Sequence, residues 1–406
     1  MKKFLSIVGP GLLVAATGIG AGDLATASFA GSALGTAVLW AVAVGALMKF
    51  SVTEGLARWQ LATDTTLMEG VVDRLGAIFG WVFLAYLVFW SFFVGSALMS
   101  ACGVALHALV PIFDDAQTGK VGFGVLCSLL GWARVTAGGY ALFEKFMKAC
   151  IGFMCLTVIG TAAVLWPGTE EVLVGLLRPS IPDGDGAMGW TIALMGGVGG
   201  TVTVLCYGYW IREEGRSGPG ELHTSRIDLA AAYAVTAVFG IAMVIIGSTI
   251  EIEGRGATLL VGLSERLEES LGPVGKWAFL LGAAGAVFSS LLGVWQAVPY
   301  LFADTWQQLR EAGDQRIEVD AGSRPYRLYL AALALLPMAG LFTGFQQIQK
   351  SYAVVGAWFF PALTLALLVM NNRAAWVGKG ARNGFLANLA LVVVLVFFSW
   401  IAVRSF

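Results

Sequence analysis

The chain has 406 residues, of which 58% are hydrophobic and only 13% are charged, and its formal net charge is −1. With a mean hydropathy of +0.79, this composition indicates a polytopic membrane protein. A near-neutral chain offers no basic surface to a nucleic acid, so nucleic-acid binding is excluded as a function class. The five cysteines lie in apolar segments without a CxxC pair, which predicts neither a disulfide nor a zinc site.

Apolar runs separated by polar breaks predict about eleven membrane spans, because a helix needs about 20 apolar residues to cross a bilayer. Lys2 and Lys3 lead into a first run that is too long for the core of a cleaved signal peptide, so we expect this span to be retained. The predicted spans lie near 7–34, 36–60, 78–110, 121–137, 143–166, 189–211, 227–250, 275–302, 326–344, 350–370 and 384–403.

Lysines and arginines gather in the loops on one side of these spans. If the N-terminus is cytoplasmic, the loops with most positive charges are cytoplasmic too, as the positive-inside rule requires. An odd number of spans then places the C-terminus outside. We expect an integral protein of a bacterial inner membrane, in contact with the lipid bilayer.

The first span contains an unusual stretch, Gly18-Ile19-Gly20-Ala21-Gly22-Asp23, and the sixth contains a second one, Gly196-Gly197-Val198-Gly199-Gly200-Thr201. Each glycine weakens a helix by about 1 kcal/mol relative to alanine, so both spans should be broken there. Glycine-broken spans at corresponding positions of two halves are typical of inverted-repeat transporters. The loops are short enough for a single integral-membrane domain over residues 1–406. Its predicted parts are repeat one at about 7–166, repeat two at about 189–370 and an extra helix at about 384–403.

Asp23 is the strongest candidate for a ligand, since a carboxylate in mid-bilayer costs at least about 2.5–3.5 kcal/mol unless it is paired, hydrated or bound to a cation. We expect it to bind a metal ion together with backbone oxygens at Gly20 and Gly200 and the hydroxyl of Thr203. In the alternative interpretation, Asp23 caps the broken helix or pairs with Lys49.

Motifs for catalysis are missing from the sequence. GxSxG, HExxH and phosphate-loop patterns do not occur. The two histidines, His107 and His223, are predicted to lie on opposite sides of the membrane, so they cannot form one site. We therefore expect a protein that is not an enzyme and needs no cofactor.

The chain resembles the Nramp transporters, which carry transition-metal ions, often with protons. The resemblance lies in Ile7–Ala30 with its Gly-Pro-Gly opening, in Leu39–Arg58 followed by Leu61-Ala62-Thr63, and in Ala278–Met370, which includes Pro361. The Asp-Pro-Gly-Asn motif of the family matches Gly20, Ala21, Gly22 and Asp23, so the usual acid is absent and a carboxylate stands three residues later. Its Met-Pro-His motif falls on Thr203, Val204 and Leu205.

Further departures from the family pattern bear on the transported ion. Ala97 and Ser100 stand where the third span usually carries acids, and Phe359 replaces a glutamine ligand. Loss of the methionine removes a soft ligand, which favours a hard ion, and loss of the histidine and acids removes the expected proton relay. These departures are similar to those of the Nramp-related magnesium transporters.

Together, the residues and the resemblance predict an all-α polytopic membrane protein with a LeuT-type 5+5 inverted repeat plus one extra helix. Its expected function is the transport of a divalent cation, magnesium or manganese, by alternating access without proton coupling. No obligate protein partner is evident. A second hypothesis is transport of a small organic solute such as an amino acid or amine, bound by Asp23, Gly22, Tyr207 and Phe359. A third is a scaffold or sensor that transports nothing.

Overall fold

The structure is a computed structural model that describes residues 10–11, 14–15, 19–137, 141–184, 186–251, 256–310 and 321–404, with only the backbone described for 21, 141–151 and 404. The regular elements in the described part of the chain are all helices, with no strand, so the predicted all-α class is confirmed. The elements are η1 (Ala21–Thr26), α3 (Ala27–Leu34), η2 (Gly35–Val38), α4 (Leu39–Thr63), α5 (Leu67–Leu75), α6 (Ala77–Leu109), α7 (Ala116–Ala137), α8 (Ala141–Val164), α9 (Thr169–Leu177), α10 (Ala187–Gly197), η3 (Val202–Leu205), α11 (Cys206–Glu213), η4 (Pro219–Glu221), α12 (Leu222–Gly247), α13 (Leu259–Arg310), α14 (Arg324–Leu335), η5 (Leu336–Phe342), α15 (Phe345–Ala357), α16 (Phe359–Asn371), α17 (Ala374–Val377), η6 (Lys379–Ala381) and α18 (Phe385–Arg404).

Every predicted span overlaps described helix, but the number of spans is not settled by length and composition. Within the described residues, eight helical stretches are long and apolar enough to cross a membrane, or nine if α8 and α9, bent by 115°, are counted as one span. The first two predicted spans are partly merged, since one helical stretch runs from Gly22 to Thr63. The count of eleven and the repeat boundaries therefore stay predictions.

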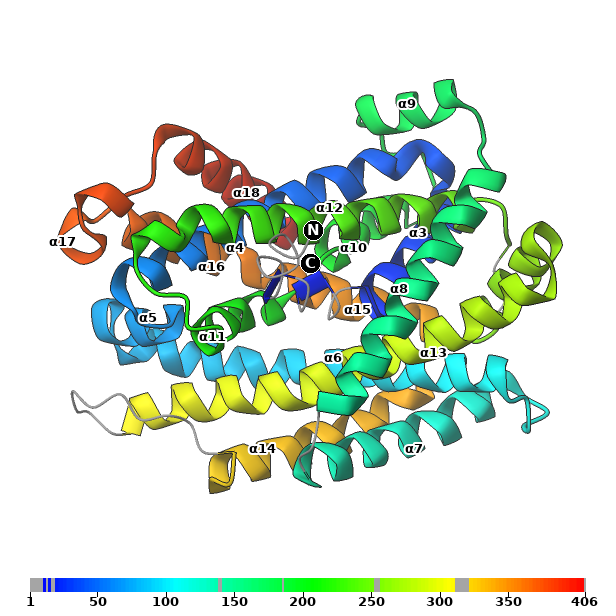
Figure 1. Cartoon of the computed structure of the whole chain (residues 1–406), viewed down its shortest axis with the longest axis horizontal. Helices are drawn as coiled ribbons and strands as arrows, with labels where there is room; N and C mark the ends of the chain where they lie inside the picture. Colours follow the sequence, from blue (N-terminus) through cyan, green and yellow to red (C-terminus); the bar gives the residue numbers. More distant parts are fainter. Residues whose placement is uncertain are drawn as a thin grey trace.

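The helices form a bundle that runs along the long axis of the molecule (Figure 1). On one side, α6 packs against α7 and α13, and α13 also contacts α8 and α14. On the other side, α12 packs against α3 and α4. Between them lie α10 and its partner α15, and the segment from α10 to α11 is almost entirely buried. The two glycine-rich stretches are thereby brought into the centre of the bundle.

Arginine and acid side chains join the helices at one end of the bundle, on the left in Figure 1, which we call the basic end. There the carboxylate of Glu54 pairs with Arg58 at 2.6 Å and with Arg226 at 2.8 Å. Asp228 pairs with Arg216 at 3.2 Å and accepts the backbone N–H of Gly11 at 2.9 Å. These contacts tie the first span, α4 and α12 together.

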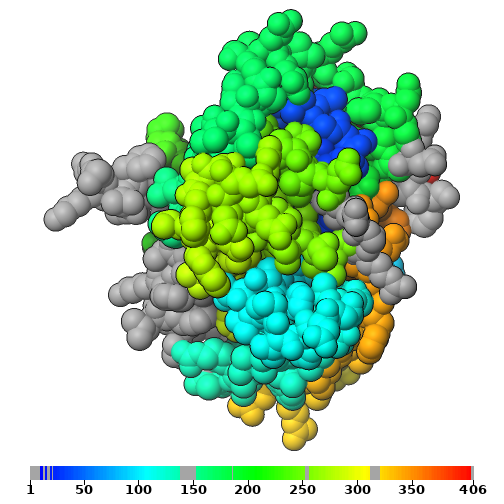
Figure 2. Space-filling model, turned by 90° about the vertical axis from the view of Figure 1, so that its right-hand side faces the viewer, coloured from blue at the N-terminus to red at the C-terminus, as the bar shows by residue number. Residues whose placement is uncertain are grey.

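The start of α13 covers the centre of the opposite end, which Figure 2 shows facing the viewer. This part of α13 buries Leu263 and Leu267 and exposes Glu265. Gly272, with φ of 71°, then kinks the helix before it enters the bundle.

Helices α3 and α12 touch through their backbones. A methyl group added at Gly31 would lie 2.3 Å from the carbonyl oxygen of Val244, and one added at Gly247 would lie 2.5 Å from that of Ser28. Small residues at such a crossing let helices approach closely within a membrane. The crossing fixes the position of α3, and with it the position of Asp23 one turn earlier.

This contact predicts that Gly247→Ala lowers stability by about 1–3 kcal/mol, because the added methyl group forces the two backbones apart. The measurement is the melting temperature of the purified protein in detergent. Gly160→Ala on α8 is the matched control, since a methyl group there meets nothing within 4 Å. Equal melting temperatures for the two variants would contradict the crossing.

Candidate functional site

The breaks in the first and sixth spans lie next to each other. In the first, Ile19 and Gly20 form a turn that leads into the single π-helical turn η1; Gly18 lies outside the described residues. In the second, α10 ends at Gly197 and the backbone of Val198–Thr201 is not helical. The break predicted in the sixth span is therefore confirmed.

Glycine is required within the second break for two reasons. Gly199 and Gly200 have φ of 72° and 86°, a conformation that other residues adopt only with strain. Gly199 also packs so tightly that an added methyl group would lie 2.7 Å from Cε1 of Tyr233. Gly22 reaches the same break from the first span, since a methyl group there would lie 3.1 Å from the carbonyl oxygen of Gly197.

Asp23 joins the two breaks. Its side chain is completely buried, and Oδ1 accepts the backbone N–H of Gly199 at 3.1 Å. Its second oxygen, Oδ2, is buried and has no hydrogen-bond partner among the described residues. A buried carboxylate oxygen without a donor is costly, and a bound cation would satisfy it. One oxygen thus binds the second break, whereas the alternative interpretation placed the cap on the first span, and the other oxygen is available as a ligand.

Lys49 is completely buried on α4 and also binds the second break. Its Nζ donates to the carbonyl oxygens of Gly196 and Val198, at 2.9 Å each, and of Gly200. The ring of Phe360 lies 4.5 Å from Nζ, a cation–π distance. The three carbonyl oxygens match the three N–H donors of an ammonium group. Among the described residues, no ion pair joins Lys49 to Asp23.

The other predicted metal ligands have the following positions. Thr203 lies beside Gly200, because a methyl group on Gly200 would be 2.8 Å from Oγ1 of Thr203. The carbonyl oxygen of Gly200 accepts from Lys49. Gly20 faces α13, with an added methyl group 2.0 Å from Oγ of Ser290, and its carbonyl oxygen accepts the N–H of Leu24 at 3.2 Å. The structure thus groups Asp23, Gly200 and Thr203, and places Gly20 at their edge.

Two residues that were predicted to line an organic-solute pocket contact other groups. The hydroxyl of Tyr207 donates to Asp228 at 3.1 Å, within the cluster of the basic end. Phe359 stacks on Tyr86 with ring centroids 5.7 Å apart, beside an apolar cavity between α5, α6 and α16. Its neighbour Phe360 is the ring that faces Lys49.

Some residues near the breaks were not predicted. Thr201 Oγ1 accepts Nε1–H of Trp90 at 3.1 Å and lies 3.5 Å from the hydroxyl of Tyr352. Thr26, one turn after Asp23, is buried with no partner for its Oγ1 in the described part of the chain. The available signal was a threonine in an apolar span, which is too common to single out.

The chemistry of the site depends on oxygen atoms. Across the described residues, no group of three or more His, Cys, Asp or Glu side chains could hold a metal ion. A cation at the breaks would therefore have one carboxylate, together with hydroxyl and carbonyl oxygens. This is a ligand set for a hard, partly hydrated ion.

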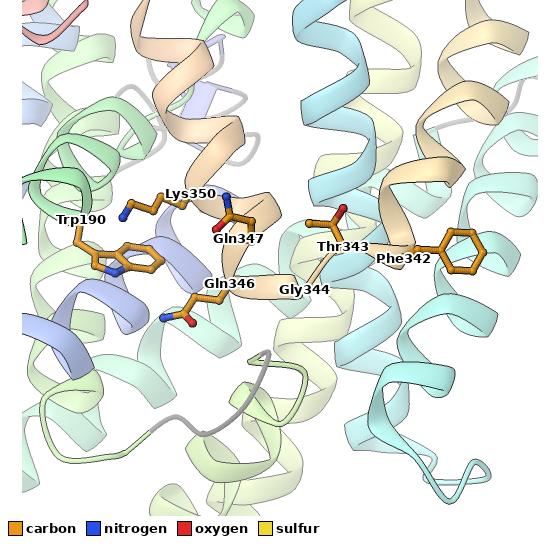
Figure 3. A pocket seen from close by; sticks show the side chains of 7 residues that line it. All are labelled: Trp190, Phe342, Thr343, Gly344, Gln346, Gln347 and Lys350. Carbon is orange, nitrogen blue, oxygen red and sulfur yellow. The ribbon is translucent and has the colours of Figure 1, made fainter. Parts of the chain in front are cut away.

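A cavity of about 530 Å³ lies between α10 and α15 toward the end opposite the basic end. Figure 3 shows its lining, in which Gln346 and Lys350 of α15 extend toward Trp190 of α10. Nζ of Lys350 lies 5.2 Å from the centre of the Trp190 ring. Helix α10 runs from Trp190, which lines the cavity, to the break at Val198. The cavity therefore lies between the breaks and the end of the bundle opposite the basic end.

Comparison with known proteins shows one family. The model of the Nramp family, described as natural resistance-associated macrophage protein-like, matches residues 11–406. The divalent metal cation transporter MntH of Aeromonas hydrophila subsp. hydrophila is 26% identical over 253 residues, which are 60% of this chain and 59% of that protein. The metal transporter Nramp6.1 of Populus trichocarpa is 26% identical over 48% of this chain and 34% of its own length. The chain thus spans less than two thirds of these relatives.

Solved structures share the fold. A mutant of the manganese transporter of Eremococcus coleocola has a TM-score of 0.72 at 16% identity, covering all of this chain and 86% of its own. MhsT in complex with L-phenylalanine has a TM-score of 0.56 at 17% identity, covering 96% of this chain and 98% of its own. The predicted likeness to LeuT-type transporters is therefore confirmed for the fold.

The packing of the second break predicts a specific effect of Gly199→Ala. Alanine at a positive φ costs about 1–2 kcal/mol, and the contact with Tyr233 adds about 1–3 kcal/mol. The control is Gly215→Ala, because Gly215 has φ of 68° with nothing within 4 Å of an added methyl group. Melting temperatures in detergent should fall further for Gly199→Ala; an equal fall would refute the contact.

Proposed function

Because the chain belongs to the Nramp family, we propose that it is a secondary transporter, and not an enzyme, that moves a divalent metal cation across the membrane by alternating access. One observation carries this proposal. At the junction of two broken spans, the buried Oδ2 of Asp23 has no hydrogen-bond partner in the described part of the chain. Broken spans that meet near the middle of the membrane are where transporters of this architecture hold their substrates.

The proposed ion is magnesium or manganese. Asp23 Oδ2 and Thr26 Oγ1 are unpartnered oxygens one turn apart, and Thr203 adds a hydroxyl near the second break. Oxygen ligands with few charges suit a hard dication that keeps part of its water shell. The names of MntH and of the Eremococcus coleocola transporter support a divalent metal, and manganese in the second case.

Transport without proton coupling is the second part of the proposal. Ala97 and Ser100, which the resemblance places at the acids of the third span, carry no ionisable side chain. The membrane potential supplies the driving force instead. A dication that enters a negative interior gains about 4.6 kcal/mol per 100 mV, at about 2.3 kcal/mol for each charge.

We further propose that the basic end faces the cytoplasm of a bacterial cell, with the protein in the inner membrane, the N-terminus inside and the C-terminus outside. The arginines of this end support that orientation. The cavity between α10 and α15 would then face outward. The rival hypothesis of an organic solute loses support, because Tyr207 and Phe359 contact other groups.

Asp23→Asn should reduce the flux of magnesium and manganese into proteoliposomes by at least about tenfold, because the amide can still cap Gly199 but has lost the charge that attracts the ion. Glu171→Gln is the control, since it makes the same chemical change at a carboxylate that accepts one hydrogen bond, from Thr36 at 2.6 Å, far from the breaks. Undiminished flux in folded Asp23→Asn would rule out this site.

Uptake of either ion should not acidify the lumen of proteoliposomes that contain a pH-sensitive dye, since no proton crosses with the metal. The experiment uses a dication gradient with the membrane potential clamped by potassium and valinomycin. Acidification that depends on the dication, and that is absent from protein-free liposomes, would refute uncoupled transport.

A further inference from the structure

Lys49 binds a set of atoms that would suit a metal ion. The carbonyl oxygens of Gly196, Val198 and Gly200, which we call the carbonyl ring, all accept from its Nζ. These carbonyls come from alternate residues, and they converge because the backbone leaves the helix after Gly197. Rings of backbone carbonyl oxygens are how proteins hold cations that have lost their water. Here the cation is part of the protein.

The charges of Lys49 and Asp23 lie on opposite sides of one peptide group. The C=O and N–H of a trans peptide point in opposite directions. The peptide between Val198 and Gly199 gives its carbonyl to Lys49 and its N–H to Asp23. The negative end of this peptide dipole therefore faces Lys49 and its positive end faces Asp23, so the peptide group lies between the two side chains.

A metal ion at Asp23 would meet the positive charge of Lys49 at close range. The carbonyl ring could not serve as its ligand while the ammonium remains, because the three N–H groups of Lys49 bind its oxygens. Like charges repel strongly in a buried site, where water screens little. Lys49 and a metal ion thus compete for the carbonyl oxygen of Gly200, which accepts from Lys49 and is also a predicted metal ligand.

We propose that Lys49 is a tethered cation that occupies the carbonyl ring when no substrate is bound, and that a divalent ion takes the ring only by displacing it. This inference rests on the proposed function. It also assigns Lys49 a role in specificity. The tether keeps the ammonium close to the carbonyl ring, so a free monovalent ion of equal charge has no electrostatic advantage over it. A dication has that advantage, because it is attracted more strongly to Asp23 and to the carbonyl dipoles.

The first test measures manganese affinity by titration calorimetry in detergent for wild type, Lys49→Met and Lys49→Arg. Methionine keeps most of the apolar stem without the charge, so affinity should rise roughly tenfold or more, and sodium at 0.1 M should now weaken manganese binding. Arginine keeps the charge, so affinity should stay as in wild type. The matched control is Lys120→Met, because Lys120 is also fully buried but binds a carbonyl remote from the breaks, that of Thr343 at 2.5 Å.

The outcomes separate this inference from the proposed function. Equal or weaker manganese binding by folded Lys49→Met, with binding retained in wild type, would overturn the competition and leave the metal transporter standing. Absence of manganese and magnesium binding from both wild type and Lys49→Met would overturn the proposed function, and the inference with it. A rise in affinity that Lys120→Met shares would also overturn the inference, because it would not depend on the carbonyl ring.

A second test measures the effect of the metal ion on the wild-type protein, and variants serve only to assign its signals. With ¹⁵N at lysine Nζ, the buried ammonium groups of Lys49 and Lys120 should give slowly exchanging NMR signals, which Lys49→Arg and Lys120→Arg assign. Saturating magnesium should remove or shift the signal of Lys49 and leave that of Lys120 unchanged. An unchanged Lys49 signal at magnesium saturation, verified by calorimetry on the same sample, would overturn the displacement.

Discussion

The centre of this protein depends on one constraint, which is that a charge inside a membrane must be met by oriented dipoles when water is absent. The unwound backbone of Val198–Thr201 supplies those dipoles in both directions. Its carbonyl groups hold the ammonium of Lys49, and the N–H of Gly199 holds one oxygen of Asp23. A continuous helix would bind these groups to itself and leave both charges without partners. The break is therefore the condition under which an acidic and a basic side chain can lie in the same apolar core.

The glycines make this arrangement sterically possible. Gly199 and Gly200 turn the chain through positive φ angles, and Gly199 lies against Tyr233 with no room for a side chain. Gly22 brings the first span to within contact of Gly197. The same residues that weaken the helix thus also let the two spans approach, so Asp23 can reach across. A site of this kind needs few ligating side chains, because most of its polar atoms are backbone.

The sequence predicted those features whose signals are local. A carboxylate in an apolar run and clustered glycines identified Asp23 and the break near Gly199, and the apolar runs identified the helices. Features that depend on the path of the chain could not be predicted. The alternative interpretation paired Lys49 with Asp23, yet the hydrogen-bond partners of Lys49 are carbonyls of a segment about 150 residues away. Phe359 and Phe360 differ by about 100° around the helix axis, and only the packing of α16 against α4 decides which of them faces Lys49. The number of spans stays a prediction for a similar reason, since helices that join or bend cannot be separated by length and composition.

The backbone crossing of α3 and α12 has a mechanical consequence. Contacts between side chains can absorb a small displacement by changing rotamers, but the contacts of Gly31 and Gly247 involve main-chain atoms and have no rotamers to change. A tilt of α12 should therefore move α3 with it. Asp23 lies in η1, which runs directly into α3, and α3 is held by its backbone contacts with α12. Helix α12 also carries Arg226 and Asp228 of the basic end, so a displacement at that end should reach the carboxylate of Asp23 through α12 and α3.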